Sequence, residues 1–268
     1  MIILYLVVAI VIVYILSTFC GKPSKSFGEF CGWAYAHRGL HGDKAPENSL
    51  EAFRRALEAG YGMELDVHLL KDGKLAVLHD SSLVRMTGKE GRVEDLCSDS
   101  LSQYSLLDTK ETIPLLTDVL DLLNGDVPLI VELKAQTDNY KQLCAKICEV
   151  LDQYNGSYCI ESFDPRCIYW FRKNRPEVIR GQLTENYFAT PGSKLPFVLK
   201  LPLVMQMFNF LTQPDFVAYR FSDRKNFSDF LVRKLWHIPS VTWTITSIDD
   251  YNTAVSEGRI PIFENFLP

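Results

Sequence analysis

Short apolar runs recur along residues 33–268 and alternate with longer stretches in which apolar residues repeat every three or four positions. The short runs are typical of buried strands, and the longer repeats are typical of helices that pack one face on a sheet. This alternation predicts an α/β fold with a parallel sheet, and the length suits one (β/α)8 barrel. Strands are expected at 33–37, 62–67, 74–79, 128–133, 157–162, 178–183, 215–219, 241–246 and 260–263. Helices are expected near 139–154, 164–174, 227–236 and 248–257.

These nine strand candidates exceed the eight positions of a barrel, so one of them is expected to be an extension outside it. A further helix is expected after Asn48, which can cap it with Glu51 three residues on. The long irregular stretch between His79 and Thr117 is expected to lie at the mouth of a fairly open site.

The first 21 residues contain no charged side chain, and nearly all of the first 16 are Ile, Leu, Val or Tyr. A run of this length is just sufficient to cross a bilayer, so a single-pass transmembrane anchor is expected at 1–21. A cleaved signal peptide would need a basic residue before the run and small residues after it, and neither is present. Residues 22–32 are polar and rich in turn formers, which predicts a linker to one domain at 33–268.

Charge and cysteine content limit the compartment and the partners. Lys22 and Lys25 follow the apolar run and no positive charge precedes it, so the 33–268 domain is expected on the cytoplasmic side of the cell membrane. Seven scattered cysteines suit a reducing compartment, and Cys144 and Cys148, on one helix face, are expected to be core residues. The net charge of −5, without a basic cluster, argues against nucleic acid as a partner.

Polar clusters close four of the apolar runs, where strands are expected to end. They are His37-Arg38-Gly39, Glu64-Leu65-Asp66, His79-Asp80 and Glu132-Leu133-Lys134. Side chains at positions i and i+2 of a strand share a face, so Glu64 and Asp66 project together. Two such carboxylates repel unless a cation lies between them, and oxygen ligands favour Mg²⁺ or Ca²⁺. Glu132 is the expected third ligand from a neighbouring strand.

The histidines and the basic residues of these clusters add the chemistry of phosphate ester hydrolysis. His37 and His79 each follow an apolar run directly and are candidates for general base and general acid. Arg38 and Lys134 are candidates for holding phosphate oxygens, and the alternative is ordinary ion pairing with the carboxylates. His68 continues the i, i+2 series from Glu64 but leads into a polar turn, so it is interpreted as a surface residue.

In their order and spacing, these strings resemble the glycerophosphodiester phosphodiesterase family, in the form of a membrane-anchored member of bacterial type. The resemblance covers roughly residues 33–268. It rests on Ala36-His37-Arg38-Gly39, Ala45-Pro46-Glu47-Asn48-Ser49 with Ala52-Phe53, Glu64-Leu65-Asp66-Val67, Lys71-Asp72-Gly73, Leu78-His79-Asp80, Arg85-Met86-Thr87-Gly88 with Gly91, Ile113-Pro114-Leu115-Leu116 with Val119-Leu120, Glu132-Leu133-Lys134, Ser162-Phe163 and Trp243-Thr244.

The resemblance implies a TIM barrel in which residues matching Glu64, Asp66 and Glu132 ligate a divalent cation, Mg²⁺ or Ca²⁺. It also implies acid–base roles for His37 and His79 and phosphate contacts from Arg38 and Lys134. Glu47 is expected to orient its neighbours, and Trp243 to line the pocket near the glycerol or the leaving group, unless it is a core residue. The chain departs from the family pattern at Trp243-Thr244-Ile245-Thr246 and in the closing Ile262-Phe263-Glu264-Asn265-Phe266-Leu267-Pro268.

The expected activity is metal-dependent hydrolysis of glycerophosphodiesters to an alcohol and sn-glycerol 3-phosphate. A lysophospholipase D-type enzyme acting on lipids with one acyl chain is the close alternative, and an inactive, membrane-anchored binding module is a further one. The apolar stretch 195–211 is interrupted by Pro196 and Pro202. This stretch either lies on a membrane beside the site or forms a buried barrel helix.

Overall fold

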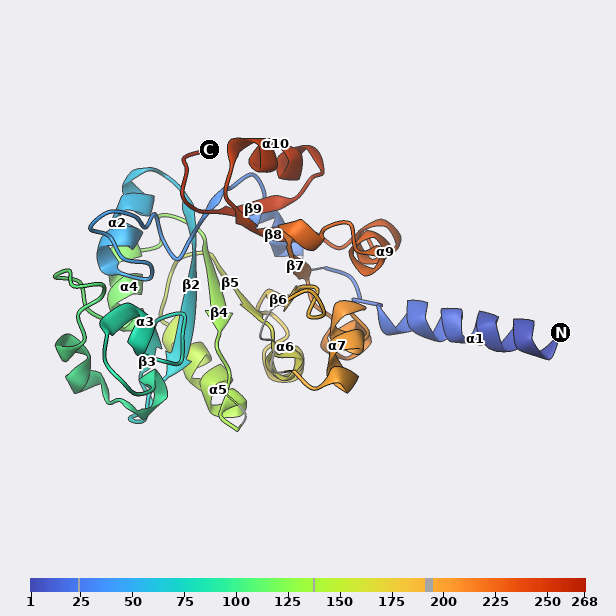
Figure 1. Ribbon diagram of the computed structural model, residues 1–268, viewed down its shortest axis with the longest axis horizontal. Helices are drawn as coiled ribbons and strands as arrows, with labels where there is room; N and C mark the ends of the chain where they lie inside the picture. Colours follow the sequence, from blue (N-terminus) through green and yellow to red (C-terminus); the bar gives the residue numbers. More distant parts are fainter. Residues whose placement is uncertain (24, 137, 191–194) are drawn as a thin grey trace.

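A closed barrel of parallel strands forms the centre of the molecule (Figure 1). The computed structural model describes residues 1–23, 25–136, 138–190 and 195–268, and in these residues all nine expected strand regions are strands. Eight of them pair in the order β1-β9-β8-β7-β6-β5-β4-β2, and β1 pairs with β2 to close the barrel. The barrel strands are β1 (Tyr35–His37), β2 (Gly62–Leu69), β4 (Leu129–Leu133), β5 (Tyr158–Ser162), β6 (Arg180–Thr184), β7 (Phe216–Arg220), β8 (Ser240–Ile245) and β9 (Ile260–Phe263).

The ninth strand, β3 (Leu75–Val77), lies outside the barrel. It runs antiparallel to β2, with Val67 opposite Val77 and Leu69 opposite Leu75. On its other side, Ala76 forms an isolated antiparallel bridge to Leu115. The strand is buried because a separate apolar cluster from residues 70–113 also covers it. This strand is the surplus member of the nine. It brings the chain back so that His79 follows close to the end of β2.

Helices surround the barrel and bury one apolar face each against it. The four predicted near 139–154, 164–174, 227–236 and 248–257 are confirmed. Cys144 and Cys148 lie in the core between barrel and helices, as predicted. The helices are α2 (Leu50–Glu58), α3 (Val84–Thr87), α4 (Leu116–Leu123), α5 (Tyr140–Leu151), α6 (Pro165–Asn174), α7 (Phe197–Val204), α8 (Asn209–Thr212), α9 (Phe227–Leu235) and α10 (Ile248–Ser256). Short 3₁₀ helices are η2 (Val93–Asp95), η3 (Ser98–Gln103) and η4 (Phe221–Asp223).

The N-terminal apolar run is helix α1 (Ile2–Ser17), which projects from the barrel beside α7 (Figure 1). It has 16 residues, and at 1.5 Å per residue it is about 24 Å long, shorter than a hydrocarbon core of about 30 Å. Among the described residues, no helix has both the length and the apolar character needed to span a bilayer. The transmembrane part of the fold prediction is therefore not confirmed.

The segment expected to be a linker, 22–32, contains the 3₁₀ helix η1 (Lys25–Phe30), and residue 24 lies outside the described residues. Phe27 and Phe30 are buried, and Phe27 stacks on Phe216 with 5.1 Å between ring centroids. Phe216 and Tyr35 are the first residues of their strands, so η1 covers the end of the barrel where the strands begin. The opposite end of the barrel, where the strands finish, is not covered by η1 and is where the candidate site lies.

Candidate active site

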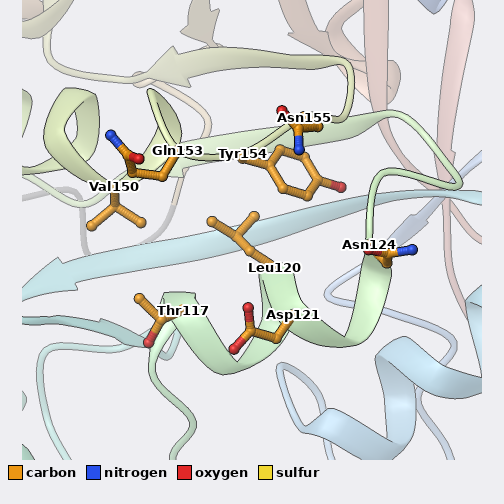
Figure 2. A pocket seen from close by; sticks show the side chains of 8 residues that line it. All are labelled: Thr117, Leu120, Asp121, Asn124, Val150, Gln153, Tyr154 and Asn155. Carbon is orange, nitrogen blue, oxygen red and sulfur yellow. The ribbon is translucent and has the colours of Figure 1, made fainter.

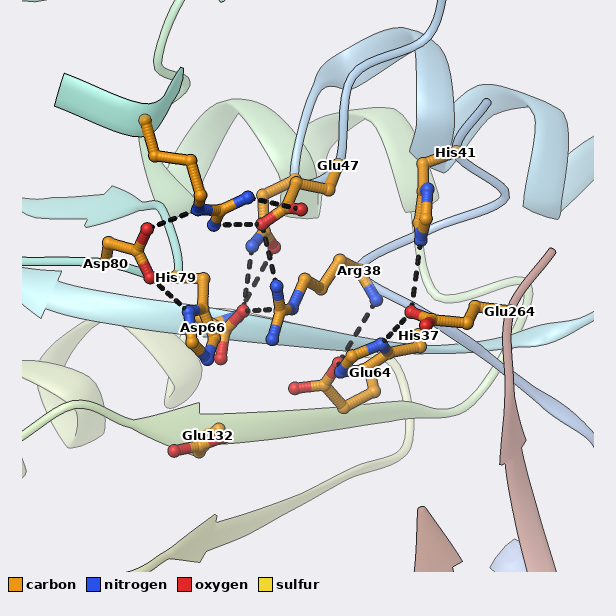
Figure 3. A network of polar contacts seen from close by, with 12 residues as sticks. His37, Arg38, His41, Glu47, Glu64, Asp66, His79, Asp80, Glu132 and Glu264 are labelled. Atoms are coloured by element: carbon orange, nitrogen blue, oxygen red, sulfur yellow. Dashed lines mark hydrogen bonds and ion pairs between the residues drawn. The ribbon is translucent and has the colours of Figure 1, made fainter. Parts of the chain in front are cut away.

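The predicted site residues meet at the carboxyl ends of the barrel strands. Parallel pairing sets His37 of β1 beside Glu64 of β2, and Asp66 of β2 beside Glu132 of β4. One carboxylate oxygen from each of Glu64, Asp66 and Glu132 lies within 4.8 Å of the other two. The three side chains are buried. Glu64 and Asp66 are two residues apart on β2, so they project from the same face, which points into the barrel. Figure 3 shows them grouped with His37 and His79.

The three carboxylates are not equally compensated by cations. The Nζ atom of Lys134 lies 2.9 Å from Asp66 Oδ1 and 2.7 Å from Glu132 Oε1. Burial favours the protonated form of Asp66, but its basic neighbours, Lys134 first and then His79 and Arg38, together outweigh burial and hold the pKa of that carboxyl well below its usual range. Burial, reinforced by Asp66 and Glu132, raises the pKa of Glu64 well above its usual range. Within the described chain, Glu64 forms no ion pair with a lysine or arginine.

This arrangement fits a hard divalent cation. The donor set is oxygen only, which suits Mg²⁺ or Ca²⁺ better than zinc. The raised pKa of Glu64 reflects repulsion that a further positive charge would relieve. Glu64, Asp66 and Glu132 are therefore the residues that could hold the ion.

His37 is held by a carboxylate that sequence reasoning did not identify. Its Nδ1 atom lies 2.6 Å from Oε2 of Glu264, and its Nε2 atom faces Glu64 Oε2 at 3.9 Å (Figure 3). The same Glu264 oxygen lies 3.5 Å from Nε2 of His41. Burial lowers the pKa of His37 and outweighs the opposing effect of Glu264. His37 is therefore neutral at neutral pH, as a general base must be.

His79 has a matching carboxylate directly beside it in sequence. Its Nδ1 atom lies 2.6 Å from Oδ1 of Asp80, and Asp80 also forms an ion pair with Arg85. The hydrogen bond to His79 and the charge of Arg85 hold the pKa of Asp80 well below its usual range. The charged Asp80 fixes the orientation of the His79 ring, and a general acid needs such positioning.

Arg38 occupies a backbone conformation that few residues with side chains adopt. Its φ is 56°, in the left-handed region, and it is retained although such a residue costs about 1–3 kcal/mol. The turn aims the Arg38 backbone N–H at Glu64 Oε2 (3.1 Å) and its guanidinium at Glu47 Oε1 (2.8 Å). Gly39 follows because a Cβ there would lie 2.8 Å from the backbone carbon of Ala52. The string His37-Arg38-Gly39 is thus a turn that directs the side chains of His37 and Arg38.

Glu47 holds two arginines. It accepts hydrogen bonds from Arg38 and, at 2.7 and 2.9 Å, from both terminal nitrogens of Arg85. The predicted role, orienting neighbours rather than binding metal, agrees with this geometry. Arg38 and Lys134, the predicted phosphate contacts, are engaged here by carboxylates, as the alternative interpretation expects.

Asn48 is not the predicted helix cap. The first turn of α2 is capped by Ser49, whose side chain accepts a hydrogen bond from the backbone of Ala52. Asn48 instead has a φ of 58° and donates from Nδ2 to Asp66 Oδ2 at 2.8 Å. It therefore positions a carboxylate of the candidate metal site. The turn needs this conformation so that the amide can reach back into the barrel.

The prediction that His68 is a surface residue is wrong. Its side chain is buried, with Nδ1 2.9 Å from Glu94 and Nε2 3.1 Å from the backbone oxygen of His79. Burial raises the pKa of Glu94, but the hydrogen bonds with His68 and Ser81 and a backbone hydrogen bond together outweigh it and lower that pKa to about 2. His68 therefore fixes the backbone that carries His79.

A cavity opens among these residues, and Trp243 is part of its wall. The indole nitrogen donates to the backbone oxygen of Ala218 at 3.3 Å, and the ring packs edge-on against Phe163. The lining residues are His37, Arg38, Glu64, His79, Glu132, Glu161, Phe163, Leu183, Trp243, Thr244 and Ile262. Asp66 and Lys134 are not among them.

A second hollow lies on the outer surface between α4 and the end of α5 (Figure 2). Its described lining contains one ionisable carboxylate, Asp121, and no histidine, so it lacks the groups for acid–base chemistry. The lining residues are Thr117, Leu120, Asp121, Asn124, Val150, Gln153, Tyr154 and Asn155. The barrel cavity is therefore the candidate active site.

Comparison with known families assigns the chain. The glycerophosphoryl diester phosphodiesterase family pattern matches residues 37–220, which include all seven catalytic, phosphate-contacting and metal-binding candidates. The chain belongs to this family. It is therefore an enzyme of the phosphoric diester hydrolase class. The matched range ends before Trp243 and Glu264, where the chain also departs from the family's usual strings.

Relatives in the family come from bacteria and mammals. A glycerophosphodiester phosphodiesterase of Bacillus altitudinis is 34% identical over 172 residues, which cover 60% of this chain and 70% of the relative. Glycerophosphodiester phosphodiesterase 1 of Mus musculus is 28% identical over 254 residues, covering 82% and 73%. Each of these matches therefore covers more than half of this chain and at least 70% of the relative.

Solved structures share the fold. A phosphodiesterase from Oleispira antarctica, in complex with the product sn-glycerol-3-phosphate, superposes with a TM-score of 0.70 at 22% identity, covering 88% of this chain and 93% of that one. A glycerophosphodiester phosphodiesterase from Thermotoga maritima gives 0.64 at 24% identity, covering 86% and 93%. The predicted TIM barrel is confirmed.

Proposed function

We propose that this phosphodiesterase hydrolyses glycerophosphodiesters to an alcohol and sn-glycerol 3-phosphate, with His37 and His79 as general base and general acid. The observation that carries the proposal is the meeting of two carboxylate-held imidazoles with a three-carboxylate cluster around one cavity. That set provides the acid, the base and the charge compensation that a phosphate diester requires. Relatives named for this activity support the choice of substrate.

The two histidines are suited to opposite roles. His37 is neutral, and its Nδ1 is engaged by Glu264, so Nε2 is the atom available to accept a proton from the nucleophile. The nucleophile is either water or a hydroxyl of the substrate itself. His79 is oriented through Nδ1 by Asp80, so its Nε2 delivers a proton to the leaving oxygen. Both line the cavity, so both reach a substrate bound there.

The remaining residues handle charge. Glu64, Asp66 and Glu132 would hold the divalent cation, which when bound neutralises phosphate charge. Arg38 lines the cavity and presents a planar fork to phosphate oxygens, and Lys134 supplies a point charge from the end of β4. Both cations now balance Asp66, so a bound phosphate would compete for them with this carboxylate.

A glycerol 3-phosphate release assay tests the proposal. Glycerophosphocholine, glycerophosphoethanolamine and glycerophosphoglycerol would be offered to the full chain with Mg²⁺, with Ca²⁺ and with a chelator. We expect release of glycerol 3-phosphate from at least one diester in the presence of one ion, and its loss with chelator. Release of a phosphorylated alcohol and free glycerol instead would contradict the proposed bond cleavage.

Lysophospholipids are a second candidate substrate, because aromatic side chains lead from the cavity toward the outside. Trp243 packs against Phe163 with 5.5 Å between centroids, and Phe163 packs against Tyr187 at 6.4 Å. The next residue, Phe188, packs against Phe197 at the start of α7 at 5.7 Å. Such a row could carry one acyl chain. Comparing kcat/KM for glycerophosphocholine and lysophosphatidylcholine decides between the two substrates.

We also propose that α1 and the start of α7 contact lipid, at the cell membrane and from the cytoplasmic side. Helix α1 is apolar on all faces and has no buried residue, and Phe197 and Val198 of α7 are about three-quarters exposed, at 76% and 75%. We expect the full chain to sediment with anionic liposomes and Val7→Glu/Val11→Glu to weaken this. Equal sedimentation of both proteins, or none of either, would contradict the proposal.

A further inference from the structure

Glu161, on β5, is a buried carboxyl group in the cavity wall that the acid–base scheme does not use. Its side chain is 1% exposed, yet it lines the same cavity as His37 and His79. In the part of the chain that the structure describes, its Oε2 atom has no hydrogen-bond partner. A buried polar atom left unpaired is costly, so its retention beside a cavity points to a ligand that pairs with it.

The surroundings of Glu161 make a metal ion an unsuitable partner. Pairing of β4 with β5 puts Glu161 next to Glu132, but its oxygens are not part of the group in which Glu64, Asp66 and Glu132 lie within 4.8 Å of one another. The other neighbours along the wall are Phe163 and Leu183, which offer no ligand atom. Glu161 therefore lies beside the cation cluster without belonging to it, where the charged and the apolar parts of the wall meet.

A hydroxyl group suits this position in either protonation state of the carboxyl. A hydroxyl donates to a carboxylate oxygen and accepts from a carboxylic acid, so it pairs with Oε2 without a charge. Carbon atoms next to the hydroxyl would contact Phe163, Leu183 and Trp243, which line the same cavity. A short polyol, polar on one edge and apolar along its carbons, matches such a wall.

We propose that Glu161 binds a free hydroxyl of the substrate's glycerol moiety and makes the enzyme selective for glycerol over alcohols that lack that hydroxyl. The inference rests on the proposed glycerophosphodiester activity. It adds a specificity-determining residue from β5 to a site whose acid–base and charged groups come from β1 to β4 and β9. The glycerol is assigned here rather than the leaving alcohol because Glu161 is almost fully buried and leaves room only for a compact group.

The test is a substrate-by-variant comparison on the full chain. kcat/KM would be measured for glycerophosphocholine and for its two deoxy analogues, lacking the 1- or the 2-hydroxyl of the sn-glycerol 3-phosphate moiety. The variants are Glu161→Leu, Glu161→Gln, which keeps an amide able to donate and accept, and Glu149→Gln as a control with the same chemical change at an exposed position of α5. Thermal melting of each variant checks that it is folded.

We expect the wild type to prefer the parent over one deoxy analogue by about 100-fold, because a site built around a hydroxyl rejects an analogue without it. In Glu161→Leu, kcat/KM should fall about 100-fold for glycerophosphocholine and little for that analogue, so the preference disappears. Glu161→Gln should keep most of the preference, and Glu149→Gln should keep all of it. If Glu161→Leu slows the parent and both analogues equally, or changes none of them, the proposal is wrong.

Equilibrium binding separates this inference from the proposed function. The dissociation constants of sn-glycerol 3-phosphate and of propane-1,2-diol 1-phosphate and propane-1,3-diol phosphate would be measured by calorimetry on the same proteins. Wild type that releases no glycerol 3-phosphate from any diester overturns the proposed function. A Glu161→Leu variant that binds all three phosphates with wild-type ratios overturns the role of Glu161, whether or not the wild type is active.

Discussion

The two sides of the cavity are built on different chemistry. On the side of β1, β2 and β4, charged groups are held in pairs and triads. His37 pairs with Glu264 and His79 with Asp80 (Figure 3). Lys134 pairs with two carboxylates. On the side of β5, β6 and β8, the wall consists of Phe163, Leu183 and Trp243 with the single carboxyl of Glu161.

The charged side holds the groups proposed to carry out the reaction, and the apolar side holds those proposed to select the substrate. A charged group in a buried wall tolerates little change, because removing one partner leaves the other unpaired in a medium of low dielectric constant. An apolar wall tolerates substitution with smaller losses, since its contacts are many and individually weak. The chain departs from the family's usual strings at Trp243-Thr244-Ile245-Thr246, on the apolar side, and also in the closing string 262–268, which supplies Glu264 to the charged side.

Replacing Glu64 is expected to have the largest effect. It is the carboxylate of the cluster without a lysine or arginine partner in the described residues, so Glu64→Ala leaves Asp66 and Glu132 balanced by Lys134 and removes the reason for a cation to bind. We expect activity to fall below detection and calorimetry to show loss of Mg²⁺ or Ca²⁺ binding. Glu58→Ala, on the exposed end of α2, is the matched control. Retained ion binding in Glu64→Ala would disprove the ligand assignment.

Removing either imidazole is expected to have the second largest effect on activity. His37→Ala or His79→Ala should lower kcat by about 10²-fold or more, the usual contribution of a positioned acid or base. Ion binding should persist, which distinguishes these variants from Glu64→Ala. His237→Asn, at an exposed position after α9, should behave as wild type. Near-normal turnover in the double variant His37→Ala/His79→Ala would refute the acid–base roles.

Replacing Glu264 should have an intermediate effect and change the pH profile. Glu264 raises the pKa of His37 while burial lowers it, so Glu264→Gln removes the raising effect and lowers this pKa further. His37 then stays neutral to lower pH, and the acid limb of kcat/KM should shift toward lower pH. We expect kcat to fall about 10-fold, because the ring is less firmly oriented.

The measurement for Glu264→Gln is the pH dependence of kcat/KM together with KM at neutral pH. A role confined to folding would lower the melting temperature without moving the acid limb. His41→Asn is a useful comparison, since His41 contacts the same Glu264 oxygen at 3.5 Å but does not line the cavity. An acid limb that moves to higher pH would contradict the assignment.

The barrel and the charged wall were largely predictable from the sequence, because both depend on local patterns. Every expected strand exists, and Glu64 and Asp66 share a face because they are two residues apart on β2. Local patterns could not show which of the nine strand candidates lay outside the barrel. β3 has the same apolar character as the others, and only its antiparallel pairing with β2 distinguishes it.

The missed site residues are those whose partners are distant in sequence or hidden by a competing local role. Glu264 meets His37 across 227 residues, and the signal available was barrel closure, which makes the first and last strands neighbours. The sequence suggested a local role for Asn48 as a helix cap, but its amide donates a hydrogen bond to Asp66 instead. His68 was misread because the polar turn after it suggested exposure, whereas Glu94 covers it from a separate segment.

Changing the apolar wall is expected to have the smallest effect. Trp243→Phe keeps an aromatic ring beside Phe163 but loses the hydrogen bond to Ala218, so the wall moves slightly and the reacting groups opposite do not. We expect KM to rise about 3-fold and kcat to change less, since a lost neutral hydrogen bond contributes about 1 kcal/mol. The ratio of kcat/KM for lysophosphatidylcholine and glycerophosphocholine should change more than either kcat. If Trp243→Phe instead lowered kcat as much as His79→Ala does, the aromatic wall would take part in the chemistry, and the division between the two sides of the cavity would not hold.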